Sequence, residues 1–222
     1  MYSKFKKDNQ IEFKNNRFNY ITVPVEMCYY VARNKLFSPF ELYLLLKLSC
    51  DGILKVDRKQ LAKKLNKTPR TVSNNLHSLI KLNWVGHNKE TDNYFIRGFD
   101  KVRKEYGFNK RIGVGFRKKY LHTVKGFVIG AIIGNLNNNA RRALRGIDAY
   151  HKGKAIQSLF PYYPKYMVVA NSSLEKVLSV SVSTASNYNS LAINAGLAKR
   201  TRHSIEIGKN VKTGAVKTYY QE

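Results

Sequence analysis

The sequence predicts an α+β fold, mainly helical, in which one structural unit occurs twice. The string LAKKLNKTPRTVSN at 61–74 returns in outline as LEKVLSVSVSTASN at 174–187, a shift of 113 residues. Residue types that favour helix ends recur at nearly the same shift, and each copy precedes two strand-like segments. The 222 residues are enough for two small domains, each with its own core.

Composition indicates an anionic partner. Forty Lys and Arg against fourteen Asp and Glu give a formal net charge of +26. Such a chain carries a strong positive field, which attracts DNA, RNA or a membrane surface. The apolar share of 43% is too high for a disordered basic tail. We therefore expect a folded nucleic-acid-binding protein.

Cysteines and hydropathy indicate the compartment. Cys28 and Cys50 lie in apolar stretches without CxxC spacing, which favours buried thiols over a disulfide or a zinc site. The first ten residues contain no apolar run, and the longest run, 127–133, is too short to cross a bilayer. We expect a cytoplasmic protein that binds no membrane, metal or other cofactor.

The repeat begins upstream of the shared string. Residues 20–30 (YITVPVEMCYY) resemble residues 111–121 (RIGVGFRKKYL) at a shift of 91, and both begin with the alternation of a strand. Apolar helical stretches follow, at Phe40–Leu48 in the first copy and Phe127–Leu136 in the second. The change from 91 to 113 implies 22 extra residues in the second copy. They fall within a basic insertion at 137–165.

Capping residues define the first helix pair. Asp57 precedes Gln60 by three residues, the spacing of a capping box at a helix start. Thr68 followed by Pro69 predicts the start of the next helix, and Asn83 is suited to a left-handed residue at its end.

The second copy carries similar signals. Ser172 precedes Glu175 by three residues, a capping box displaced by two positions relative to the first copy. Ser181 matches Thr68 as an N-cap, and Gly196 matches Asn83 as a left-handed residue. These three matches, two of them at the shift of 113, predict two helix-turn-helix motifs.

A hairpin is expected after each motif. In the first copy Trp84–Asn88 and Tyr94–Arg97 flank a polar turn, and in the second Leu197–Ile207 and Ala215–Tyr220 flank KNVKTG. A helix-turn-helix followed by a hairpin is a winged helix, so the sequence predicts two tandem winged helix-turn-helix domains. The predicted organisation is a basic N-terminal arm (1–19), domain 1 (20–97), a basic linker (98–110) and domain 2 (111–222).

Helical spacing places polar side chains opposite the apolar stripe of the second helix in the first copy. That stripe comprises Val72, Leu76, Leu79 and Ile80. Arginine pairs with guanine and asparagine with adenine, whereas hydroxyls and lysines contact phosphates. We expect DNA contacts from Thr68, Arg70, Thr71, Ser73, Asn74, His77 and Lys81, and from Lys89 in the hairpin turn.

The corresponding face of the second copy carries only hydroxyls and amides. The expected DNA contacts of this helix are Ser181, Ser183, Thr184, Ser186, Asn187 and Ser190. Charge is supplied beside it, by Lys199, Arg200 and Arg202 in the wing and by Arg141, Arg142 and Arg145 in the insertion. An alternative is that this helix has lost contact with DNA and the second copy binds a protein.

No catalytic set is evident. The five histidines are scattered, acidic residues are few and dispersed, and no GxxxxGK[ST] phosphate loop occurs. We therefore expect a binding protein, not an enzyme.

The two-copy architecture, from Tyr20 to Tyr220, resembles the replication initiators of iteron-type plasmids. The resemblance implies that both winged helices bind double-stranded DNA at adjacent major grooves of a repeated origin site. It also implies recruitment of host replication proteins and a homodimer that represses its own gene. Two alternatives remain: a transcriptional regulator of a phage or mobile element, and a non-specific architectural or RNA-binding protein.

Overall fold

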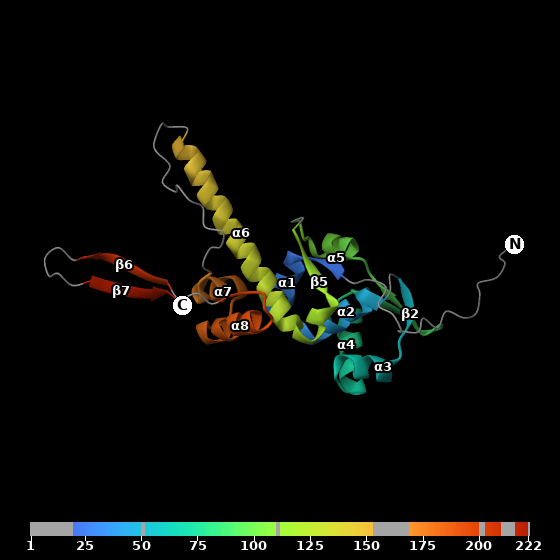
Figure 1. Ribbon diagram of the computed structural model, residues 1–222. Coiled ribbons are helices and arrows are strands. Elements are labelled where there is room, and N and C mark those ends of the chain that lie inside the picture. Colours follow the sequence, from blue (N-terminus) through green and yellow to red (C-terminus); the bar gives the residue numbers. More distant parts are fainter. Residues whose placement is uncertain are drawn as a thin grey trace. The chain divides into compact units, whose positions relative to one another are not determined.

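The computed structural model describes residues 20–49, 52–109, 112–152, 169–199, 203–209 and 216–221. It is an α+β structure, mostly helical, with small antiparallel sheets (Figure 1). The predicted fold class is therefore confirmed at this level. The chain divides into two compact units, one ending at Val124 and the other beginning at Lys125.

The first unit contains most of the strands. Its elements are β1 (Tyr20–Pro24), α1 (Val25–Arg33), α2 (Phe37–Ser49), β2 (Ile53–Lys55), α3 (Arg58–Leu65), α4 (Pro69–Lys81), β3 (Val85–Asn88), β4 (Asn93–Ile96), α5 (Phe99–Tyr106), β5 (Gly113–Arg117) and the 3-10 helix η1 (Lys118–Thr123). The predicted helix at 40–48 is confirmed as part of α2. The predicted hairpin is confirmed as β3 and β4, which join β2 in an antiparallel sheet of order β2-β4-β3.

The core of the first unit forms around α2 and Trp84. Helix α2 packs against α4 and is buried on most of its surface, because its sequence is apolar nearly all round. Trp84 is fully buried, and the rings of Phe40, Tyr43 and Tyr106 lie 5.3–6.2 Å from it. These aromatic contacts connect the end of α4 to α2 and α5.

The predicted linker contains the helix α5. Phe99, Val102 and Tyr106 form an apolar stripe at helical spacing, which a count of basic residues does not reveal. The hydroxyl of Tyr106 donates to the carbonyl of Leu82 at 2.7 Å, directly after α4. Glu105 forms an ion pair with Arg97, N to O 3.4 Å, and so connects α5 to the sheet.

The strands expected to open the two copies pair with each other. β1 and β5 form an antiparallel ribbon in which Val23 lies opposite Val114 and Ile21 opposite Phe116. Val23 and Val114 are also related by the shift of 91. The two repeated strands therefore pair with each other symmetrically about this residue pair. The pairing places residues 113–117, expected in domain 2, in the first unit.

The second unit contains α7 (Asn171–Leu178), α8 (Val182–Asn194), β6 (His203–Lys209), β7 (Val216–Gln221) and most of α6 (Val124–Lys152). Helices α7 and α8 pack together, and β6 pairs with β7 in the predicted hairpin (Figure 1). The first strand begins at His203, not at Leu197, because residues 195–197 form the turn that ends α8. The predicted helix 127–136 continues to Lys152, so the first part of the expected insertion extends α6.

Two glycines of α6 allow close packing against the end of α8. A Cβ on Gly126 would lie 2.5 Å from the carbonyl oxygen of Leu191, and one on Gly130 would lie 2.6 Å from the Cβ of Leu197. Any larger residue at these positions would separate the two helices. None of the described helices is long and apolar enough to span a membrane.

Candidate nucleic-acid interface

The two helix pairs have the same bounds under a shift of 113 residues: α3 corresponds to α7 and α4 to α8. The turn between the helices contains a left-handed residue in both copies, Asn66 with φ 51° and Ser179 with φ 54°. Asn83 (φ 57°) and Gly196 (φ 69°) follow the second helices and are left-handed, as predicted. The two copies therefore share backbone conformation where their side chains differ.

The N-caps of the second helices are confirmed. The Thr68 hydroxyl accepts a hydrogen bond from the Thr71 N–H at 3.2 Å, and the Ser181 hydroxyl accepts one from the Thr184 N–H at 3.3 Å. In each pair the two hydroxyl oxygens lie 2.9 Å apart. Each copy therefore presents two neighbouring hydroxyls at the start of its second helix.

The caps of the first helices differ between the copies. Asp57 accepts hydrogen bonds from the N–H groups of Lys59 and Gln60, so its role as N-cap is confirmed. The prediction for Ser172 is wrong: α7 begins at Asn171, and its N-cap is Ala170, which has no capping side chain. Ser172 lies inside the first turn, because α7 begins at the position that matches the start of α3 under the shift of 113.

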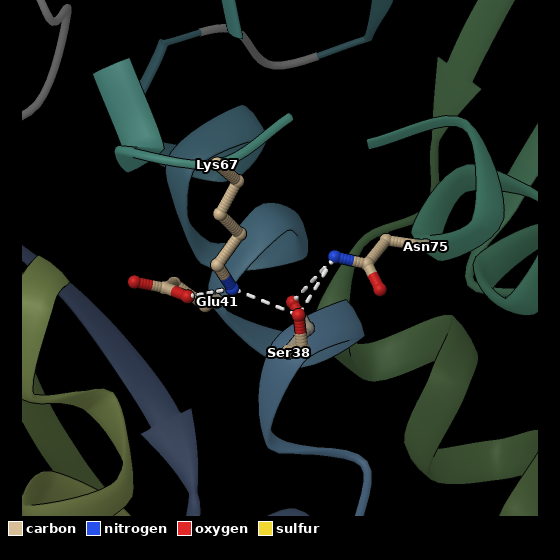
Figure 2. A network of polar contacts seen from close by, with 4 residues as sticks. All are labelled: Ser38, Glu41, Lys67 and Asn75. Atoms are coloured by element: carbon tan, nitrogen blue, oxygen red, sulfur yellow. Dashed lines mark hydrogen bonds and ion pairs between the residues drawn. The ribbon is translucent and has the colours of Figure 1, made fainter. Parts of the chain in front are cut away.

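A polar network fixes α4 against α2 (Figure 2). The buried Asn75 amide donates to Ser38, at 2.9 Å to the hydroxyl and 3.2 Å to the carbonyl. Lys67 donates to the same hydroxyl at 2.8 Å and forms an ion pair with Glu41. The network thus joins the turn before α4, the middle of α4 and the start of α2.

Sequence reasoning missed this network, although one signal was present. Asn75 lies at helical spacing with Val72, Leu76 and Leu79, so a polar residue occupies the apolar stripe. A polar residue at such a position indicates a buried hydrogen-bond partner. That partner, Ser38, lies 37 residues away in the sequence, so its identity depends on the tertiary structure.

The predicted contact residues of α4 lie on its outer face. Thr68, Arg70, Asn74, His77 and Lys81 are exposed, whereas Thr71 and Ser73 are half-buried. The His77 Nδ1 lies 2.9 Å from the Ser73 carbonyl oxygen. Because a carbonyl oxygen only accepts, Nδ1 carries the proton of this hydrogen bond, and the other ring nitrogen, Nε2, takes no part in it. Of the predicted apolar stripe, Val72, Leu76 and Leu79 are buried and Ile80 is half-buried.

The hairpin of the first unit has an ordered tip. The Asn88 side chain accepts hydrogen bonds from the N–H groups of Glu90 and Thr91, which shapes the turn. His87 contacts Asp92 at 2.8 Å and stacks on Tyr94 with ring centroids 4.3 Å apart. Lys89, the predicted wing contact, is exposed at this tip.

Additional cations surround the contact face of the first unit. Arg58, Lys59 and Lys63 of α3 and Lys55 of β2 are exposed. Lys64 is half-buried, and its pKa is lowered by partial burial and by the positive charge of Lys118 on η1. A phosphate near these two lysines would relieve their repulsion. The basic residues of α3 were not among the predicted DNA contacts, although four of them lie close together in the sequence.

The outer face of α8 is neutral, as predicted. Ser181, Ser183 and Asn187 are exposed, and Thr184, Ser186 and Ser190 are half-buried. Ser190 donates to the Ser186 carbonyl at 3.2 Å, in the position that His77 and Ser73 occupy in the first copy. The Asn189 amide donates to the Asn171 side chain at 2.7 Å and so connects α8 to the start of α7.

The predicted cations of the second unit are described only in part. Lys199 and Arg142 are exposed and Arg141 is half-buried, with both arginines on α6. Arg145 is within α6, but its side chain lies outside the described residues, as do Arg200 and Arg202. Lys125 lies over the Tyr188 ring, its Nζ 5.2 Å from the centroid, so α6 also places a cation beside α8.

Among the described residues, no group of three His, Cys, Asp or Glu side chains is arranged to hold a metal ion. Comparison with protein-family models, with curated proteins and with solved structures finds no significant match to this chain.

Proposed function

We propose that the chain is a sequence-specific double-stranded DNA-binding protein built from two winged helices. The observation that carries the proposal is the repetition of one helix-turn-helix geometry in a chain of net charge +26. A helix pair of this kind presents its second helix to a major groove, and the surrounding cations neutralise phosphates.

The element order of each copy supports the winged-helix assignment. In the first unit α2, β2, α3, α4, β3 and β4 follow one another, and the three strands form one antiparallel sheet. In the second, α6, α7, α8 and the β6–β7 hairpin follow the same order, and the position matching β2 (166–168) lies outside the described residues. The hairpin after each second helix is the proposed wing.

For the first winged helix (the first head, which contains α3, α4 and the β3–β4 hairpin) we propose direct base contacts from Arg70 and Asn74. Both are exposed within the first two turns of α4, and the N-terminal residues of a recognition helix reach base edges. Arginine recognises guanine through two acceptors, and asparagine recognises adenine through a donor and an acceptor. Lys81, near the far end of α4, and Lys89, in the wing, would contact phosphates.

For the second head we propose weaker contacts of a different kind. At the shift of 113, Ser183 replaces Arg70 while Asn187 retains the asparagine of Asn74. Hydroxyl and amide groups form hydrogen bonds with bases or phosphates but contribute little long-range attraction. The two heads therefore differ in chemistry while sharing backbone geometry.

Within this class, we favour a plasmid or phage replication initiator that binds repeated origin sites. Two unequal winged helices in one chain match an asymmetric site, which can be repeated in one direction, whereas a symmetric dimer of single winged helices matches a palindrome. The second candidate is a transcriptional regulator of a phage or mobile element. Footprinting on the DNA beside the gene distinguishes them: direct repeats support the initiator, and a single palindrome supports the regulator.

DNA-binding measurements with matched variants test the proposal. After selection of a preferred duplex from a random pool, Arg70→Ala and Asn74→Ala should each cost about 1–3 kcal/mol and relax specificity at one position. Lys81→Ala should weaken all duplexes alike and reduce the salt slope by about one. The matched change in the second head, Asn187→Ala, reports whether that head contacts bases.

Three outcomes count against the proposal. Equal affinity for all duplexes would contradict sequence-specific recognition and favour an architectural protein. A uniform loss of affinity in Arg70→Ala and Asn74→Ala would reduce these residues to phosphate contacts. Preferential binding to structured RNA over every duplex would indicate an RNA-binding protein.

A further inference from the structure

The outer face of the three-stranded sheet in the first unit exposes an aromatic side chain. Phe95 of β4 is 39% exposed, and its cross-strand neighbour on β2, Ile53, is 54% exposed. On the other side Phe95 lies opposite Gly86 of β3, which has no side chain to cover the ring. Neighbouring positions such as Leu54 and Tyr94 face inward and are buried, as strand alternation requires.

The same face is polar and positively charged one row further along the strands. Lys55, two residues from Ile53, is exposed and lies opposite Asn93. Asn93 in turn lies opposite Asn88 on β3. The three strands contain no aspartate or glutamate, and of the two exposed acids in the turn beyond them, Glu90 and Asp92, the latter is paired with His87. An exposed ring therefore has a cation and the Asn93 amide nearby, a combination suited to a base and its phosphate, while the Asn88 side chain is engaged in the turn.

We propose that this face, comprising Ile53, Phe95 and Lys55, binds single-stranded nucleic acid by stacking an unpaired base on Phe95. Bases stack on exposed aromatic rings without regard to sequence, because every base has a π face. Lys55 neutralises the adjoining phosphate, and the bare backbone at Gly86 leaves room for the base beside the ring.

A second copy of this chain fits the face less well. A stable interface buries about 800 Å² on each partner, far more than two large apolar side chains provide. Two copies would also bring together two Lys55 side chains in a protein of net charge +26, with no acidic residue on these strands to compensate. One exposed ring is, by contrast, enough to stack one base.

Binding of labelled oligo(dT) tests the inference. Phe95→Ala should lower affinity for oligo(dT) about 10- to 100-fold, with duplex affinity unchanged. Phe95→Trp should retain binding, and its added fluorescence should be quenched by oligo(dT), because the only native tryptophan, Trp84, is buried. Tyr20→Ala removes an aromatic side chain that is 64% exposed elsewhere in the same unit, and should leave binding unchanged.

The outcomes separate this inference from the proposed function. Absence of oligo(dT) binding by the wild-type chain, or an equal loss for duplex and single strand in Phe95→Ala, overturns the inference. So does a wild-type dimer that Phe95→Ala dissociates in sedimentation, because the face is then a contact between copies. Each result leaves the duplex proposal standing if Arg70→Ala still alters sequence preference.

Discussion

The ion pair between Lys67 and Glu41 offers the sharpest test of how α4 is held. The two side chains are 20% and 13% exposed, and Lys67 also donates to the Ser38 hydroxyl at 2.8 Å. Lys67→Met retains the length of the side chain but leaves the Glu41 carboxylate without its partner. Because hydrogen bonds to charged groups contribute about 1.5–3 kcal/mol, we expect a loss of about 2–3 kcal/mol.

The expected loss is smaller than the 3–5 kcal/mol typical of a fully buried pair, because both side chains retain some contact with water. Replacing both partners removes the Glu41 carboxylate that Lys67→Met leaves unpaired. The double variant Lys67→Met/Glu41→Met should therefore recover most of the loss and lie within about 1 kcal/mol of the wild type. The coupling in this double-mutant cycle measures the interaction directly.

Urea unfolding followed by tryptophan fluorescence provides the assay. Trp84 is the only tryptophan and lies in the first unit, so its emission reports the unfolding of that unit. Lys63→Met, on the exposed face of α3, is the matched control and should change stability by less than about 0.5 kcal/mol. A Lys67→Met variant as stable as this control, or a double variant that loses the sum of the two single losses, would show that the ion pair does not hold α4.

Three further predictions concern packing, capping and a thiol. Gly126→Ala should destabilise the second unit by about 1–3 kcal/mol through overlap with α8, whereas Gly134→Ala, which meets nothing within 4 Å, should stabilise α6 by up to about 1 kcal/mol; thermal unfolding by circular dichroism measures both. Ser181→Ala should cost about 1 kcal/mol through loss of its cap, whereas Ser172→Ala should be nearly neutral, by the same measurement. Burial raises the pKa of the Cys28 thiol to about 12 from a usual 9.0, so this residue should resist alkylation in the folded protein and react on unfolding. A Cys50→Ser background isolates its signal in mass spectrometry.

Each of these predictions has a contrary result. Equal effects of Gly126→Ala and Gly134→Ala would mean that the two helices do not pack closely at Gly126. A larger loss of stability for Ser172→Ala than for Ser181→Ala would indicate that Ser172 does cap α7. Rapid alkylation of Cys28 under native conditions would contradict the burial of α1.

The Cys28 pKa also predicts a loss of stability in alkali. A folded-state pKa above the unfolded value means that the thiol stabilises the fold below pH 9, where it is neutral in both states. As the pH rises from 9 towards 12, the unfolded chain ionises first and the contribution is lost. Cys28→Ala should reduce the slope of stability against pH in this window, measured by the same fluorescence assay.

Local signals determined much of the first copy. Thr68, Pro69 and Asn83 act on their own neighbours, so the limits of α4 could be predicted within a residue or two. The same reasoning failed at Ser172, because α7 begins at Asn171 and buries Leu174 and Leu178, with Ala170 at its N-cap position. The helix in the expected linker was missed because the segment was interpreted from its basic residues, although Phe99, Val102 and Tyr106 lie at helical spacing; the contacts of Tyr106 with Trp84 and Leu82 form only in the fold.

The repeated helix pair, the polar outer faces of its second helices and the high density of basic residues could all be predicted from the sequence. These features depend on short-range backbone preferences and composition, which any segment carries with it. Three features appear only in the folded chain: β1 pairs with β5, Asn75 and Lys67 both contact Ser38, and Phe95 remains exposed. Such outcomes depend on contacts between residues distant in the chain, whose free energy no local pattern records.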